Sequence, residues 1–171
     1  MTPADLLADA FGRIPDTVGA TLDGIGDAVL YGRPDPEGNT IAWLVWHLIR
    51  VQDDHVCEVA GREQTWTADG WADRFALPLA DAATGYGHTP DDVAAVRPSA
   101  DLLRGYLAAV TERTLAFLRT VGPDDLDRVV DERWDPPVTL GVRLVSVVDD
   151  DAQHAGQAAL LRGVLERSAR A

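Results

Sequence analysis

An acidic side chain and a histidine lie one helical turn apart near the end of the chain. Three consecutive acids, Asp149, Asp150 and Asp151, precede His154 within an otherwise apolar stretch. Burying an unpaired carboxylate is costly, so at least one of these acids needs a cation or a strong hydrogen-bond donor. Asp150 and His154 stand at positions i and i+4, which places them on one face of a helix and suits two ligands of one metal ion. Asp151, three residues before His154, is a geometric alternative to Asp150 as a metal ligand.

The third ligand of such a site has to come from another element, and His47 is the natural candidate. It interrupts the most apolar segment of the chain, where an imidazole would otherwise need a buried partner. Two histidines and one carboxylate form a known open metal site with positions left for water or substrate. The sequence therefore predicts a divalent metal site made of His47, Asp150 and His154, and Zn, Ni and Fe(II) all accept these ligands.

A simpler interpretation of the same residues also exists. The acids could face solvent or pair with Arg143 or Arg50, and a single histidine on a helix is often a solvated residue. His55 and Asp54 follow His47 by about two helical turns and could line the same channel, but we favour a polar helix end for both.

The remaining candidates are aromatic, polar or thiol side chains. Gln157, one turn past His154, could orient that ligand. His88 could approach the site from above, although its Gly-flanked segment favours a surface loop. Cys57 lies near a helix C-terminus, where the helix dipole raises a thiol pKa, so we do not consider it a nucleophile. Three tryptophans in the connections could wall a pocket or simply pack: Trp66, Trp71 and Trp134.

Four segments have the apolar periodicity of amphipathic helices. They run from about Thr2 to Ile25, Thr40 to Ala60, Ser99 to Val121 and Thr139 to Ser168. Asn39 is the expected cap of the second helix and Gly61 its end. The first half of this helix is apolar nearly all round, which predicts that other helices or a second subunit surround it.

Two connections between the helices are long and irregular. Gln64 to Pro98 contains only short helical turns, and Val129 to Val138 is expected to be extended or irregular. A connection as long as the first is usually functional or covers a site. Four long helices with two long connections predict an all-α four-helix bundle in which residues 1–171 form a single domain. The core of such a bundle is where these folds build metal sites.

The composition excludes several function classes. The formal net charge is −13, which disfavours binding to nucleic acids and to anionic membranes. Cys57 is the only cysteine, so no intrachain disulfide can form. The N-terminus lacks the features of a signal peptide, and the apolar run from Ile41 to Ile49 is far shorter than the roughly 20 residues that cross a bilayer. We expect a cytoplasmic protein.

Three segments resemble a known family. They are Asn39 to Leu48 together with Gln52 to His55, the segment Gly85 to Pro90, and His154 to Gln157 before an apolar helix. Together they resemble DinB-like proteins over nearly the whole chain, and most closely the branch described as DUF664 and mycothiol-transferase-like. The resemblance implies a four-helix bundle, often dimeric, so we expect a homodimer.

The resemblance also implies a metal held by three histidines. One lies on the second helix and matches His47, and two lie four residues apart on the last helix. The second of these matches His154, whereas the first falls on Asp150, where this sequence departs from the pattern. A carboxylate is a competent ligand, so the site either survives with an altered metal preference or is weakened.

The function implied by the resemblance is that of a metal-dependent enzyme. Relatives bind a low-molecular-weight thiol such as mycothiol or bacillithiol and transfer it or use it in isomerisation. The expected partners are then a small-molecule thiol and an electrophile. The thiol would bind the metal as a thiolate and react with the electrophile from there. Hydrolysis by a metal-bound hydroxide would use the same residues. The alternative is a non-catalytic, stress-associated helical bundle protein that binds a metal or a small molecule.

Overall fold

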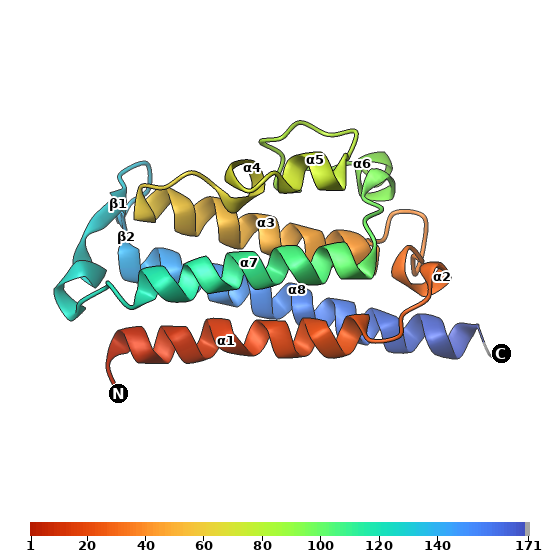
Figure 1. The fold of residues 1–171 in the computed structure, drawn as a ribbon, viewed down its shortest axis with the longest axis horizontal. Coiled ribbons are helices and arrows are strands. Elements are labelled where there is room, and N and C mark those ends of the chain that lie inside the picture. Colours follow the sequence, from red (N-terminus) through yellow and green to blue (C-terminus); the bar gives the residue numbers. More distant parts are fainter. Residues whose placement is uncertain (170–171) are drawn as a thin grey trace.

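Four long helices form the body of the molecule. The computed structural model describes residues 1–169, and its long helices are α1 (Pro3–Leu22), α3 (Ile41–Ala60), α7 (Ala100–Leu118) and α8 (Leu140–Ser168). α1 and α8 run in one direction, and α3 and α7 run in the other (Figure 1). Each helix packs against two neighbours, in the order α1, α7, α3, α8 around the bundle. The predicted all-α four-helix bundle is confirmed.

Short elements fill the connections between the long helices. They are α2 (Asp27–Leu30), α4 (Thr65–Ala68), α5 (Trp71–Phe75), α6 (Pro90–Ala95), the 3₁₀ helix η1 (Pro123–Asp127), and the strands β1 (Val129–Asp131) and β2 (Val138–Thr139). The strands pair antiparallel, with Val129 opposite Thr139. The connections from α3 to α7 and from α7 to α8 are long and irregular as predicted, except that the second one contains this small hairpin.

Side-chain caps set where the long helices begin. Thr2, Thr40, Ser99 and Thr139 each accept a hydrogen bond from a backbone N–H in the first turn of the following helix. The cap of α3 is therefore Thr40 and not Asn39, because the Thr40 hydroxyl reaches the N–H of Trp43. The first helix is shorter than expected, because it ends at Leu22 and residues 27–30 form the separate helix α2.

The apolar half of α3 is enclosed within the chain itself. Every residue from Ile41 to Arg50 is buried. α3 packs against α7 on one side and α8 on the other, and the segment carrying α4, α5 and α6 lies over it (Figure 1). The all-round apolar pattern of this helix therefore does not require a second subunit, and homodimerisation stays a prediction.

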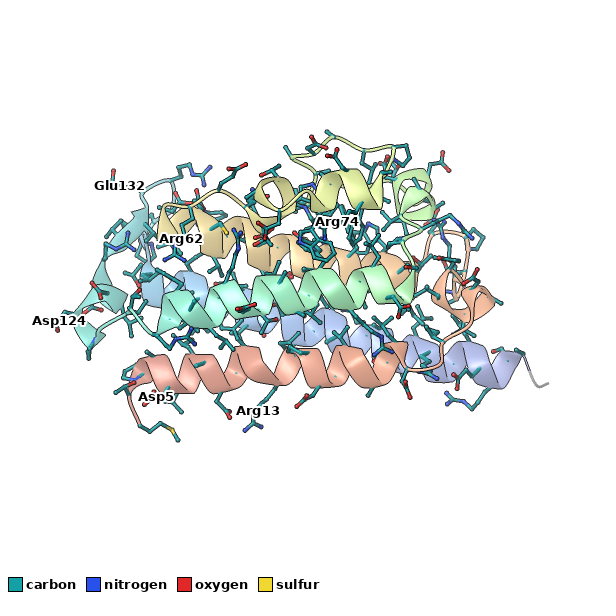
Figure 2. The ribbon with its side chains drawn as sticks, in the orientation of Figure 1. Asp5, Arg13, Arg62, Arg74, Asp124 and Glu132 are labelled. Carbon is teal, nitrogen blue, oxygen red and sulfur yellow. The ribbon has the colours of Figure 1, made fainter. Side chains whose placement is uncertain are left out.

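Charged side chains project outward from the bundle. Arg13, Asp124 and Glu132 point away from the helices in Figure 2. Within residues 1–169, no helix is both long enough and apolar enough to cross a membrane.

Candidate metal centre

The three predicted ligands converge between α3 and α8. One ligand atom each from His47, Asp150 and His154 can be chosen so that all of them lie within 4.8 Å of one another. The rings of His47 and His154 approach to 4.8 Å between centroids. His47 is buried, whereas Asp150 and His154 are half-buried. Helices α3 and α8 are antiparallel neighbours, and this packing brings together residues that are about a hundred positions apart.

A backbone carbonyl fixes the orientation of the His47 ring. The Nδ1 of His47 lies 2.5 Å from the carbonyl oxygen of Thr84, and because a carbonyl only accepts, Nδ1 carries the proton. The ring of Trp43 stacks on His47, with centroids 4.7 Å apart. Burial lowers the pKa of His47, and the hydrogen bond to Thr84 opposes this only in part. His47 therefore presents a neutral imidazole whose Nε2 lone pair can bind a metal.

His154 is oriented in a similar way by its own helix. Its Nδ1 donates to the amide oxygen of Gln157 at 3.0 Å, which confirms the expected contact between these residues. Its Nε2 lies 3.6 Å from Oδ1 of Asp150. The interaction with Asp150 raises the pKa of His154 above its ordinary value. Burial acts to raise the pKa of Asp150, but His154 and His47 outweigh it, so that the carboxyl pKa is lowered.

The site fits a divalent cation. Oδ2 of Asp150 is buried and has no hydrogen-bond partner among residues 1–169, an arrangement that is costly unless a cation lies nearby. Two neutral imidazole nitrogens and one carboxylate suit Zn, Ni and Fe(II), and three protein ligands leave coordination positions open. The identity of the metal does not follow from this ligand set.

Asp151, the alternative to Asp150 as a metal ligand, is not among the three residues that converge at the candidate site. Its side chain is fully buried on the stripe of α8 that faces the core, which includes Val147 and Ala155. Neither of its carboxylate oxygens has a hydrogen-bond partner in the described part of the chain. Burial raises its pKa well above the ordinary value, and the charge of Asp150 adds to this.

His88 lies closer to the site than a surface loop would place it. Its ring is half-buried and stacks on Trp46, with centroids 5.7 Å apart. Its Nδ1 accepts a hydrogen bond of 3.1 Å from the indole N–H of Trp43, the residue that stacks on His47. His88 therefore supports the wall of the site and is not among the three grouped ligands.

The arginines near the acidic cluster have other partners. Arg143 donates to Asp131 at 3.1 Å and to Nδ1 of His55 at 2.8 Å. Arg50 is fully buried and lies 3.8 Å from Asp53. The interpretation in which Asp149 to Asp151 pair with Arg143 or Arg50 is thus wrong.

His55 and Asp54 mark the polar end of α3, as favoured from the sequence. Asp54 accepts a hydrogen bond from Gln64. Burial and the nearby Arg143 guanidinium lower the pKa of His55, which shares a pocket with Asp150. His55 is therefore a neighbour of the candidate site and not one of its ligands.

A buried polar network holds the long connection onto α3, and the sequence analysis missed it. The carboxylate of Asp53 accepts hydrogen bonds from the backbone N–H groups of Thr65 and Trp66 and from the hydroxyl of Tyr106. Arg50 donates to the carbonyl of Ala83, next to the Thr84 carbonyl that orients His47. The signal available in the sequence was a charged pair, i and i+3, inside an apolar helix.

Cys57, Trp66 and Trp71 serve packing. Burial raises the pKa of Cys57 to about 12, so it is not a nucleophile, as expected. Trp66 and Trp71 pack around Tyr106, with ring centroids 5.3 Å and 5.5 Å away. Trp134, in contrast, lines an open pocket.

Comparison with known proteins agrees with this architecture. The family model of the DinB superfamily matches residues 10–158. The chain belongs to the DinB superfamily. A crystal structure titled as the conserved protein of locus from Enterococcus faecalis is similar to this DinB-superfamily protein, with 32% sequence identity and a TM-score of 0.90. The similarity covers 96% of this chain and 98% of that one. No curated protein matches the sequence significantly. Assignment to the DUF664 and mycothiol-transferase-like branch stays a prediction.

Proposed function

We propose that this DinB-superfamily protein is a metal-dependent enzyme that acts on a low-molecular-weight thiol of the mycothiol or bacillithiol type. The observation that supports this most directly is the convergence of His47, Asp150 and His154 around a buried carboxylate oxygen that has no hydrogen-bond partner in the described residues 1–169. A divalent ion bound there would lower the pKa of a coordinated thiol and hold the sulfur beside an electrophile.

Each protein residue has a defined task in this proposal. The Thr84 carbonyl and the Gln157 amide oxygen accept from Nδ1 of His47 and His154, which orients both rings with Nε2 available to a metal. Asp150 supplies one negative charge and thereby reduces the net charge of a loaded site. In a transfer reaction the thiol releases its proton to solvent, a bond forms between sulfur and the electrophilic carbon, and the leaving group departs with the bonding electrons. An isomerisation would use the same thiol without net consumption.

A matched pair of neighbouring acids tests the proposal. Asp150→Asn should lose the metal and the thiol-dependent activity. Asp149→Asn should retain both, because Asp149 is exposed and accepts a hydrogen bond from Gln153 on its own helix. Metal content is measured on protein purified without a tag or chelator. Transfer activity is measured as consumption of mycothiol or bacillithiol with an aryl halide, and isomerase activity as conversion of an isomerisable alkene in the presence of either thiol.

Two results would contradict the proposal. The first is a wild-type protein that holds no stoichiometric divalent metal. The second is a metal-loaded protein that neither consumes the thiol nor accelerates an isomerisation, which would favour the non-catalytic binding protein instead.

A further inference from the structure

A pocket of about 400 Å³ begins at Asp150 and extends between α8, the second half of α3 and the β1–β2 hairpin. This volume lies within the range of about 300–1,000 Å³ that is typical of small-molecule sites. Neither His47 nor His154 lines it, so Asp150 is the one candidate ligand that faces both the metal site and this pocket. The pocket therefore leads away from the candidate metal along α8.

The charged groups of the pocket are already paired with one another. Asp131 accepts two hydrogen bonds from the Arg133 side chain, at 2.9 Å and 2.8 Å, and a third from Arg143 at 3.1 Å. The other end of the Arg143 guanidinium donates to His55. Hydrogen bonds of these arginines are thus already directed to Asp131 and His55, which weakens their attraction for an anionic ligand. Asp150 is the exception, and a bound metal would neutralise it.

The remaining wall of the pocket is apolar. It consists of Val51, Val138, Val142 and Val147 and the indole of Trp134, together with Ser146, whose hydroxyl donates a hydrogen bond to the backbone carbonyl of Val142. Trp134 is 66% exposed and Val142 is 53% exposed, although both are large apolar side chains. A ligand that covers them would remove this apolar surface from water, which favours binding.

We infer that this pocket binds an uncharged, largely apolar electrophile, with its reactive group directed toward Asp150 and its apolar body along Trp134 and Val142. This inference rests on the proposed function, because it assigns the second substrate of the same site. The paired charges explain why the substrate is uncharged, and the valines and the indole explain why it is apolar.

Binding of the neutral fluorophore N-phenyl-1-naphthylamine to the metal-loaded protein tests the inference. Val142→Lys should weaken binding by about tenfold or more, because the new ammonium group would have to be desolvated beside the probe. The matched control is Val145→Lys on the same helix, since Val145 is 59% exposed but does not line the pocket. It should change the affinity by less than about twofold, as expected for a surface substitution away from the site. Trp134→Ala, which lies in a loop, should weaken binding by about threefold or more through loss of aromatic contact.

Two outcomes would overturn the inference. One is equal binding by wild type, Val142→Lys and Trp134→Ala. The other is tighter binding of the anionic probe 8-anilinonaphthalene-1-sulfonate than of the neutral one. Failure of the proposed function would look different, because metal would be missing from the wild type while the neutral probe still bound with the expected variant pattern.

Discussion

The candidate metal centre depends on how each ring nitrogen is engaged. His47 and His154 each use Nδ1 for a protein acceptor, so that Nε2 is left for the metal. These acceptors are Thr84 and Gln157, and contacts of this kind set both the tautomer and the direction of a ligand. The i, i+4 spacing revealed Asp150 and His154 from the sequence. The Thr84 carbonyl could not be predicted, because it comes from an irregular segment far along the chain.

At the residue scale, Gln157→Ala should weaken metal binding by about 10- to 100-fold, because His154 loses the acceptor that fixes its ring. Gln153→Ala is the matched control, since Gln153 is also exposed on α8 but contacts Asp149 instead. Competition with a chromophoric chelator measures both affinities. Equal affinities for the two variants would mean that Gln157 has no positioning role.

The buried carboxyl of Asp151 leads to a prediction about pH. Its folded pKa is raised, so the folded state binds a proton more tightly than the unfolded state. The unfavourable contribution of Asp151 to stability is therefore absent below the unfolded pKa near 3.8 and grows as pH rises above it. Asp151→Asn should remove this dependence and leave the protein more stable than wild type at pH 8, by roughly 1–3 kcal/mol. Urea denaturation at pH 5 and pH 8 measures the difference in unfolding free energy between Asp151→Asn and wild type. A difference that does not grow with pH would contradict the prediction.

At the scale of elements, the connection from α3 to α7 follows from helix direction. These helices are neighbours that run the same way, so the chain has to return along the bundle before α7 can begin (Figure 1). The sequence predicted this connection as long and irregular, but not what anchors it. Arg50, Asp53 and Tyr106 do so from inside the bundle, and charged residues in such positions are easily assigned to a solvent face.

Gly85 connects this segment to the metal centre. Its φ is +105°, and a Cβ there would lie 2.5 Å from Nδ1 of His47. Gly85→Ala should therefore displace the ring and weaken metal binding by about tenfold or more. Gly87→Ala separates this effect from backbone strain, because Gly87 also has a positive φ of +74° but no neighbour within 4 Å of its Cβ position. Metal affinity should be nearly normal in Gly87→Ala, and an equal loss in both variants would contradict the positioning role.

The buried network makes a separate prediction about stability. Asp53→Asn should destabilise the fold by about 3–5 kcal/mol, because it leaves the fully buried Arg50 without its anionic neighbour. Asp54→Asn, at the next and more exposed position, should cost less than about 1 kcal/mol. Chemical denaturation of both variants decides this, and similar losses would show that the network contributes little.

At the scale of the whole molecule, the order of the helices creates the site. α3 and α8 are adjacent and antiparallel, whereas α1 and α3 lie across the bundle from each other (Figure 1). The apolar periodicity predicted four helices and nearly their limits, because each helix buries one face in a shared core. It could not predict which helices are neighbours. The chemistry of His47, Asp150 and His154 supplied that information, since a buried imidazole and a buried acid each require a partner.

The pocket beside the candidate metal site was not predicted, because it forms only when distant parts of the chain come together. The pocket wall combines residues of α3, α8 and a two-stranded hairpin, and strands as short as β1 and β2 carry little periodic signal. The sequence analysis did not single out Asp131, and it considered Arg143 only as a partner of Asp149 to Asp151. Their pairing becomes visible only when the hairpin folds against α8.

The most direct test of the central claim is a crystal structure of the purified, untagged protein with anomalous data collected at the edges of Zn, Ni and Fe. We predict one ion per chain, bound by Nε2 of His47, Nε2 of His154 and a carboxylate oxygen of Asp150, with at least one position open to solvent. Absence of an ion between these three side chains in protein supplied with all three metals, or an ion bound elsewhere, would contradict the account.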